Sequence, residues 1–547
     1  MPIMPTYPGV YIEEVPSGVR TITGVATSIT AFVGRALRGP VDEPVTINSF
    51  GEFERVFGGL WVESSLGYAV QDFYLNGGSQ AIIVRLFASE PADAGVEDGE
   101  TPAAEDDETP AQDAGRAKLD VNGLPLMASS PGEWGNQLRG RVDQDIPAAI
   151  ATRYGLDISK FFNLTVRDGS TGLIEQFRNL TVEESPRQVD KVLEKESSLI
   201  RAAADFSPSG DVPTAHAEEP AEGMTIWEDD DASTPVSEAA SNGGMLSSLD
   251  FIGPGKAGAK QGLYALKNLD LFNLLCIPPI PYDNYEAEVA PLIAAAAQFC
   301  EAHRAFLLVD PPQSWSDKTR AKDGIGTVGT NSDHAAIFFP KLMKPNLLKE
   351  NQIEAFAPCG AVAGIFARTD AQRGVWKAPA GTEATLVGVP KLSVPLTDAE
   401  NGELNPLGIN CLRTLPAAGR VVWGSRTLQG DDRLASEWKY IPVRRTALFI
   451  EESLYRGTQW AVFEPNDEPL WAQLRLNIGA FMQNLFRQGA FQGSTPQEAY
   501  LVKCDRETTT QNDINLGIVN VVVGFAPLKP AEFVILKIQQ LAGQIAT

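Results

Sequence analysis

Apolar runs of strand length alternate with helical stripes of apolar residues in the first part of the chain. Residues 31–34 and 81–86 are apolar runs. Between them, apolar side chains recur at helical spacing over residues 53–57 and 66–74. Ser49 stands three residues before Glu52, the spacing of a capping box at a helix start. This pattern predicts a β-α-α-β layer.

The middle of the chain repeats the alternation in a larger unit. We expect a strand over residues 271–277, a helix over 286–303 and a strand over 304–309, joined as a right-handed parallel β-α-β unit. Its first turn lacks the Gly-x-Gly-x-x-Gly pattern of dinucleotide sites. The glycine-rich run over 253–260 lacks the Gly-Lys-Ser/Thr ending of a phosphate loop. We therefore expect no bound cofactor.

The last part of the chain combines one long amphipathic helix with a β-rich end. Residues 469–488 carry one broad apolar face, and strands are predicted over 500–503, 518–525 and 533–540. The opposite helix face is polar but almost uncharged, whereas solvated faces usually carry Lys and Glu. The prediction is a face that touches another protein, with an ordinary solvated face as the alternative; its residues are Gln473, Asn477, Gln483, Asn484 and Arg487.

Charge is concentrated in two tracts. The chain has 547 residues, enough for several domains, and a net charge of −25. Residues 90–113 and 205–238 each hold ten acidic side chains and no basic one, so the remainder carries only about −5. A balanced surface without a basic stripe disfavours nucleic-acid binding. Low hydrophobicity and one-signed charge predict disordered loops at 90–116 and 204–250, with a small inserted domain over 117–203 between them.

Cysteine and histidine usage gives little support to catalysis or metal binding. The three histidines lie far apart, and the five cysteines show no paired spacing: Cys276, Cys300, Cys359, Cys411 and Cys504. An enzyme hypothesis would use Cys359 as nucleophile with His334 and Asp333 as helpers, but a cysteine between proline and glycine is more often inert core. We expect no catalytic residue and no metal.

Targeting signals and membrane spans are not expected either. Residues 1–14 have no cationic start and no apolar core of a signal peptide. No apolar run approaches the 18 or so residues of a membrane-spanning helix. We expect synthesis and folding in the cytoplasm and no direct membrane insertion.

The stretch over residues 357–381 joins small residues to dense charge. Its first half is rich in Gly and Ala, which lets a backbone approach a neighbouring element closely. Alternating charges and a proline follow, so the stretch suits a packed junction better than a small-molecule pocket. Its sequence GAVAGIFARTDAQRGVWKAPA resembles the signature of contractile tail sheath proteins of myophages, R-type pyocins and phage-like injection particles, on Gly364, Arg368, Thr369, Asp370, Arg373, Gly374, Lys377 and Pro379.

Other segments are similar to the same family. They are the start PGVYIEE, the turn PGEWGN at residues 131–136, and the run RRTALFIEESL followed by GTQWAVFEPND. The last of these contains Trp460, Glu464, Pro465 and Asn466. Only the two acidic tracts lie outside the resemblance.

The resemblance implies an α+β or mixed α/β multidomain fold: a sheath core with an inserted outer domain and extended terminal β arms. The implied parts are an arm over 1–23, core over 24–89 and 251–425, loops over 90–116 and 204–250, the insertion over 117–203, a tube-facing inner domain over 426–525 and an arm over 526–547. In such proteins the arms add strands to neighbouring subunits. The arm strands would use Val10, Tyr11, Ile12 and Glu13, and Phe533, Val534, Ile535, Leu536, Lys537 and Ile538.

The function implied by the resemblance is mechanical. The subunit would polymerise as stacked hexameric rings in a helical sheath around an inner tube protein, between baseplate and terminal cap proteins, and contract to drive the tube through a target envelope. The long polar helix face, with Gln473, Asn477, Asn484 and Arg487, would then face the tube. Assembly would occur in the cytoplasm, before the subunit becomes part of a virion or a released injection particle. A surface-lattice protein and, less favoured, a cysteine-dependent enzyme are the alternatives.

Overall fold

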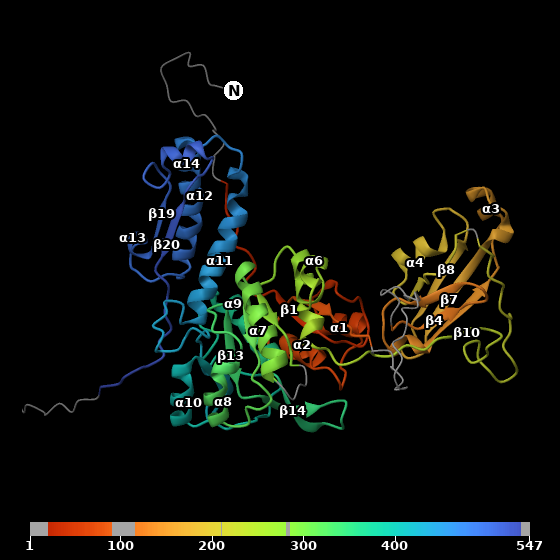
Figure 1. Ribbon diagram of the computed structural model, residues 1–547, viewed down its shortest axis with the longest axis horizontal. Helices are drawn as coiled ribbons and strands as arrows, with labels where there is room; N and C mark the ends of the chain where they lie inside the picture. The colour runs from red at the N-terminus through yellow and green to blue at the C-terminus, as the bar shows by residue number, and fades with distance from the viewer. Residues whose placement is uncertain (1–19, 90–114, 209, 280–284, 538–547) are drawn as a thin grey trace, which may run out of the picture.

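A computed structural model describes residues 20–89, 115–208, 210–279 and 285–537. Figure 1 shows three units: a central α/β unit, a C-terminal unit built around two long helices, and a β-rich unit at the right. The β-rich unit is inserted into the central one, because the chain leaves after β3 (Ala81–Arg85) and returns before α5 (Ser248–Ile252). The mixed α/β multidomain prediction agrees with this arrangement.

The central unit is built on one eight-stranded sheet with the order β18-β17-β13-β12-β11-β1-β3-β2. Its inner strands are parallel, and only the two edge strands, β2 and β18, run antiparallel. The inner strands are short, apolar and buried, as is typical of a parallel sheet covered on both faces. The strands are β1 (Thr30–Gly34), β2 (Pro44–Ile47), β3, β11 (Leu274–Cys276), β12 (Phe306–Val309), β13 (Ala335–Phe339), β17 (Ile409–Leu415) and β18 (Gly419–Val422).

Helices cover both faces of this sheet, and alternate strand residues enter two separate cores. Ala31 and Val33 face one core, whereas Phe32 faces the other. The first core is closed by α5, η3 (Gly262–Asn268), α7 (Tyr285–Ala302), α8 (Lys318–Gly324) and α10 (Asp398–Leu404). The second is closed by α1 (Phe50–Phe57), α2 (Leu66–Leu75) and α9 (Cys359–Arg373).

The predicted strand–helix–strand unit is present as β11-α7-β12 with parallel strands. The predicted β-α-α-β layer is present too, with the edge strand β2 added before α1. Short elements complete the central unit: α6 (Lys256–Ala259), η4 (Ile325–Thr327), η5 (Asn405–Leu407), and a small sheet of β15 (Gln352–Phe356), β14 (Leu342–Asn346) and β16 (Lys391–Leu392).

Helices α2 and α9 approach each other closely through two glycines. A Cβ atom on Gly360 would lie 2.0 Å from the carbonyl oxygen of Ala69, and one on Gly364 would lie 2.5 Å from that of Phe73. The two glycines are four residues apart and so share one face of α9. The predicted close backbone approach in this stretch is therefore correct, and its neighbour is α2.

The inserted unit has its own hydrophobic core beneath two antiparallel sheets. One sheet has the order β10-β6-β7-β8 and the other β4-β5-β9. Their elements are β4 (Lys118–Asp120), β5 (Pro125–Ala128), η1 (Glu133–Gln137), β6 (Leu138–Asp143), α3 (Ala148–Tyr154), η2 (Ile158–Lys160), β7 (Phe161–Asp168), β8 (Ile174–Thr181), α4 (Val189–Glu196), β9 (Ile200–Ala202) and β10 (Thr234–Pro235).

The second acidic tract is part of this unit, so the prediction of a disordered loop over 204–250 is wrong. Two arginines of β6 hold its backbone: Arg139 donates to the carbonyl of Ser233 at 2.7 Å, and Arg141 to those of Ala217 and Ala232 at 2.7 and 2.8 Å. Composition hides this, because the ordering contacts come from outside the tract. Residues 90–114 of the first tract lie outside the described residues.

One buried arginine joins the inserted unit to the sheet. The guanidinium of Arg85, at the end of β3, donates to the carbonyl oxygens of Ala36 at 2.9 Å, Gly39 at 2.7 Å and Pro131 at 2.7 Å. Burial lowers the pKa of Arg85 to about 9. Pro131 opens the PGEWGN turn, so this turn positions the insertion against the sheet.

The C-terminal unit places two long helices against a two-stranded sheet. Phe449 and Phe481 pack with ring centroids 6.1 Å apart and link the helices. The first of these helices begins at Ile441, with Pro442 in its first turn, where a missing N–H costs nothing. The elements are α11 (Ile441–Thr458), η6 (Gln459–Ala461), α12 (Glu468–Arg487), α13 (Pro496–Ala499), β19 (Tyr500–Lys503), α14 (Gln511–Asn515) and β20 (Val522–Phe525).

The α2–α9 contact predicts opposite effects for two alanine substitutions in helices. Gly360→Ala should lower the free energy of unfolding by about 1–3 kcal/mol, since the new methyl group collides with a backbone carbonyl. Gly402→Ala in α10 is the matched control, because nothing lies within 4 Å of a Cβ there and alanine favours the helix. Urea unfolding measures both; equal stability of the two variants would contradict the packing described here.

We expect His216 to make the stability of the inserted unit sensitive to acid. Its Nδ1 accepts the backbone N–H of Val142 at 3.0 Å, and its Nε2 lies 2.8 Å from the hydroxyl of Thr234. This arrangement uses the neutral ring, and burial lowers the pKa of His216. A lowered pKa means that stability is lost as pH falls through the unfolded value of about 6.5.

His216→Asn tests this sensitivity, since an amide oxygen can accept the Val142 N–H without titrating. The free energy of unfolding, measured in urea at pH 7.5 and 5.5, should fall more in the wild-type chain than in the variant. Equal falls would show that His216 does not carry the effect.

Candidate functional site

The signature helix α9 carries a buried ion pair near its end. The guanidinium of Arg445, on α11, donates to both carboxylate oxygens of Asp370, at 3.0 and 2.5 Å. The two side chains are 3% and 4% exposed. The Thr27 hydroxyl donates to the same carboxylate at 2.7 Å, and Arg445 donates back to the Thr27 carbonyl at 2.9 Å. Three segments distant in sequence therefore meet at Asp370.

The rest of the signature forms the edge of a hollow. Arg373 forms an ion pair with Glu383 at 2.8 Å, and Gly374 ends α9 with a φ of 89°, which glycine adopts without strain. Arg368 donates to the Thr385 carbonyl at 2.9 Å. Thr369 is half-buried and Pro379 is buried. The chain then borders a hollow of about 580 Å³, whose lining includes Trp376, Lys377, Trp423, Gly489 and Leu528.

The second signature segment (residues 457–467, GTQWAVFEPND) forms a turn between α11 and α12 that hydrogen bonds of Asn466 stabilise. Asn466 accepts the indole N–H of Trp471 at 2.9 Å and donates to the Ile518 carbonyl at 3.0 Å. Trp460 packs against the small core beneath the turn. Glu464 and Pro465, between them, point into solvent.

The start of the C-terminal arm is fixed by a second ion pair. Both oxygens of Glu532 accept from the guanidinium of Arg426 at 2.7 Å, and the Tyr440 hydroxyl donates to one of them at 3.0 Å. Arg426 is 1% exposed. Burial opposes ionisation of Glu532, yet Arg426 holds the pKa of this carboxyl below its ordinary value.

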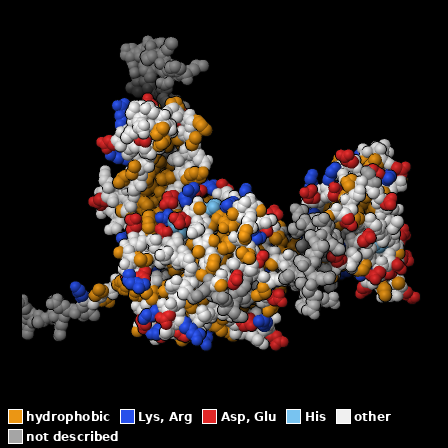
Figure 2. Space-filling view, in the orientation of Figure 1, with side chains coloured by type: hydrophobic (Ala, Val, Ile, Leu, Met, Phe, Trp, Pro, Cys, Tyr) orange, Lys and Arg blue, Asp and Glu red, His pale blue; other side chains and the backbone are white. Residues whose placement is uncertain are grey.

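Beyond Glu532 the chain leaves its own unit. Phe533, Val534, Ile535 and Leu536 are 74–81% exposed, and Lys537 is exposed as well. No strand is formed over the described part of the predicted 533–540 strand. Figure 1 shows this segment running away from the molecule at lower left, and Figure 2 shows hydrophobic side chains exposed along the C-terminal unit. The predicted position Ile538 lies outside the described residues.

The N-terminal arm positions Val10, Tyr11, Ile12 and Glu13 also lie outside the described residues. The first described residue, Arg20, lies beside the second signature segment. Its backbone N–H donates to Asn477 at 3.0 Å, and its guanidinium stacks 4.4 Å from the ring of Trp460.

The candidate tube-facing surface of α12 needs one correction. Gln473, Asn484 and Arg487 are exposed, as predicted. Asn477 is 1% exposed, because its carboxamide accepts the Arg20 N–H inside the protein. The helical wheel could not reveal this partner, which comes from the other end of the chain.

The residues of the enzyme hypothesis lie at opposite ends of two neighbouring strands of the sheet, β12 and β13. His334 precedes β13 and bonds to Asp333 at 2.9 Å, whereas the Cys359 N–H donates at 2.8 Å to Asp310, just after β12. These two strands are parallel, so their starts and ends lie apart. Burial raises the pKa of the Cys359 thiol well above its ordinary value, the reverse of an activated nucleophile.

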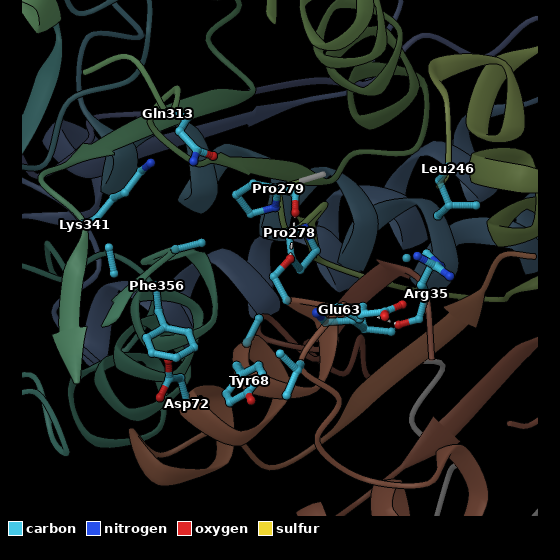
Figure 3. Close-up of a pocket in the computed structure, with 18 of the residues that line it drawn as sticks. Arg35, Glu63, Tyr68, Asp72, Leu246, Pro278, Pro279, Gln313, Lys341 and Phe356 are labelled. Atoms are coloured by element: carbon cyan, nitrogen blue, oxygen red, sulfur yellow. Dashed lines mark hydrogen bonds between the residues drawn. The ribbon is translucent and has the colours of Figure 1, made fainter. Parts of the chain in front are cut away.

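A second hollow, of about 230 Å³, lies at the carboxyl ends of β1 and β11 (Figure 3). Two of its polar side chains are already engaged. Asp72 pairs with Lys344 at 2.5 Å, and Arg35 donates to the carbonyls of Asn242 and Gly243. Cys359 is not among the described residues that line it. The hollow therefore does not complete the cysteine site.

Among residues 20–89, 115–208, 210–279 and 285–537, no group of three His, Cys, Asp or Glu side chains could hold a metal ion. None of the helices in this part of the chain is both long and apolar enough to cross a membrane.

The residues that sequence reasoning missed are the partners across each junction: Arg426, Arg445 and Glu532. Arg445 stands in the RRTALFIEESL run that carries part of the resemblance. A charged residue within the buried stripe of a helix signals a buried partner, and this signal could have singled it out. Glu532 stands alone between apolar neighbours and gave no comparable signal.

Two family models match the chain. The phage tail sheath protein central domain matches residues 253–428, and the phage tail sheath C-terminal domain matches residues 435–540. The chain is 27% identical over 181 residues to a putative prophage major tail sheath protein of Pseudomonas aeruginosa, covering 32% of this chain and 44% of the relative. It is 27% identical over 267 residues to the tail sheath protein of Burkholderia phage BcepMu, covering 45% and 53%. The chain thus spans about half the length of these two curated relatives.

Solved structures share the fold over nearly the whole chain. The contracted helical sheath of the anti-feeding prophage aligns with a TM-score of 0.54 at 23% identity, covering 98% of this chain and 100% of that one. The contracted PVC sheath complex of an extracellular contractile injection system aligns with a TM-score of 0.56 at 20% identity, covering 98% and 99%. With two matched sheath domains that together span more than half of its residues, the chain belongs to the phage tail sheath family.

Proposed function

We propose that this protein is the sheath subunit of a contractile injection particle. Its copies polymerise as stacked hexameric rings around an inner tube, and the sheath then contracts to drive the tube through a target envelope. Membership of the tail sheath family supports this function. So does the likeness in fold to two sheaths described as contracted. A surface lattice, the alternative, has no specific observation in its favour.

The observation that carries the proposal is the segment after Glu532. Four consecutive apolar side chains, from Phe533 to Leu536, stand in solvent directly after a residue held by a buried ion pair. A contiguous apolar surface marks an interaction site in a soluble protein. The fixed start and the uncovered continuation fit an arm that another copy covers.

The acceptor for such an arm would be the sheet of β19 and β20. These strands pair with each other, and among the described residues no further strand pairs with either outer edge. Unpaired edges accept an added strand through backbone hydrogen bonds. Leu501 and Val522, one on each strand, are about half exposed and would pack against the incoming side chains.

The free energy gained by exchanging a single strand is close to zero, whereas the exchange of many strands in a ring is cooperative. Each backbone hydrogen bond contributes about 0.5–1.5 kcal/mol net, whereas ordering each residue costs about 1–2 kcal/mol. Apolar burial, at about 25 cal/mol per Å², must tip this balance, and in a closed ring each arm acts at high effective concentration. We therefore expect a folded monomer that polymerises on a tube and baseplate template.

Contraction would draw its work from the assembly itself. An extended sheath behind a kinetic barrier can pass to a contracted lattice that buries more surface. The inner tube would meet the exposed face of α12 through Gln473, Asn484 and Arg487, and baseplate and cap proteins would close the two ends. The subunit would be made and assembled in the cytoplasm and then leave as part of the particle.

Truncation after Glu532 tests the role of the arm. The shortened chain should unfold at the same temperature as the full chain, since residues 533–537 contribute no buried core. Co-expressed with the tube and baseplate proteins, it should form no sheaths in negative-stain micrographs. A full-length control with serine at positions 533–536 should fail in the same way, because apolarity rather than length carries the contact; sheaths of normal length from either chain would refute the arm role.

A further inference from the structure

The turn between α11 and α12 presents an aromatic side chain outward. Phe463 is fully exposed, and its φ of 68° lies in the left-handed region that bulky residues avoid. The turn keeps this conformation because Asn466 ties it to Trp471 and to the Ile518 carbonyl. Val462 beside it is 63% exposed. Strained backbone that is held in place often marks a functional contact, and aromatic residues dominate protein interfaces.

The 580 Å³ hollow beside the end of α9 is concave and lined by lysines, whereas the turn with Phe463 protrudes from the surface. Two indoles, of Trp376 and Trp423, contribute to its lining together with Lys377 and Lys529. The Lys377 ammonium donates to the carbonyls of Ala378 and Ala380, and no carboxylate of the described residues lies within ion-pair distance of it. The hollow thus combines aromatic walls with lysine ammonium groups, and Glu532, the carboxylate among its described lining residues, is already paired with Arg426.

The exposed turn is acidic where the hollow is basic. Glu464 follows Phe463 and is exposed, and Asp467 and Glu468 stand at the start of α12. An aromatic side chain flanked by carboxylates complements a hollow with aromatic walls and amines. The volume of the hollow exceeds that of one phenyl ring and leaves room for neighbours of Phe463.

The two features cannot meet within one chain. The turn precedes α12 and the hollow includes Gly489, just after it, so the 20-residue helix separates them. At 1.5 Å per residue that separation is about 30 Å. Phe463 therefore cannot fill the hollow of its own chain, whereas the turn of a second copy can reach it.

We propose that Phe463 of one copy inserts into the hollow of the next copy, with Glu464 facing Lys377 or Lys529. Such a head-to-tail contact uses two different surfaces and therefore propagates from copy to copy, as a stacked assembly needs. The proposal rests on the proposed sheath function and adds to it a contact that the terminal arms do not make.

Cross-linking between two variant chains tests this contact. Glu464→Cys on one chain and Lys529→Cys on another keep Phe463, and the five native cysteines are buried. In particles assembled from both chains with the tube and baseplate proteins, a short bismaleimide should give a dimer band on a denaturing gel. The matched control replaces Glu464→Cys by Glu194→Cys, an exposed position on α4 of the inserted unit, and should give at least about tenfold less dimer.

A second pair of variants measures how much the aromatic side chain of Phe463 contributes to sheath assembly. Phe463→Ala should lower the yield of sheaths at least about tenfold, as truncation of an interface anchor does, while Phe463→Tyr stays within about twofold. Both should melt like the wild-type monomer because the side chain is exposed. Two results would overturn this contact and leave the proposed function standing. One is sheaths whose cross-linked dimer band is no stronger than that of the control; the other is an unchanged yield of sheaths from Phe463→Ala. A wild-type chain that forms no sheath at all would overturn both.

Discussion

The buried pair of Arg445 and Asp370 is the interaction on which the rest of the structure depends. Removing both charges from water is costly, and only good geometry compensates for it. Here the guanidinium meets both carboxylate oxygens, the Thr27 hydroxyl adds a third bond, and the Phe366 ring lies 4.9 Å from the guanidinium carbon. Because the partners stand on α9 and α11, the pair joins the sheet unit to the C-terminal unit.

Other contacts hold the remaining parts of the subunit together: a close backbone contact between α9 and α2, and hydrogen bonds from two further buried arginines. Gly360 lets α9 press on α2, which lies on the sheet. Arg85 fixes the insertion at the end of β3, and Arg426 fixes the start of the C-terminal arm. Each junction uses an arginine with several acceptors, whose fork geometry holds orientation as well as position. The proposed sheath function, in which subunits would move as whole bodies while their arms stay attached, would require junctions of this kind.

Local patterns predicted the central elements well, because apolar periodicity reports burial on a sheet or helix face. The β11-α7-β12 unit, the capped helix α1 and the glycine-rich contact of α9 were all accessible from the sequence in this way. Partners distant in sequence were not accessible. The helical pattern places Asn477 on the surface, but the backbone N–H of Arg20 is its buried partner. The composition of the second acidic tract predicts disorder, but Arg139 and Arg141 donate hydrogen bonds to its backbone carbonyls. The signature residues were found by resemblance, whereas Arg426 and Glu532 needed the fold.

The most direct test of the account is a double-mutant cycle on Asp370 and Arg445, read as free energy of unfolding by calorimetry. Asp370→Ala leaves a buried guanidinium without its partner and should cost about 3–5 kcal/mol, whereas Asp370→Leu combined with Arg445→Met should recover most of that loss. The single variant should also split one cooperative transition into two, as the sheet and C-terminal units separate. Additive losses with one unchanged transition would contradict the claim that this pair couples the two units.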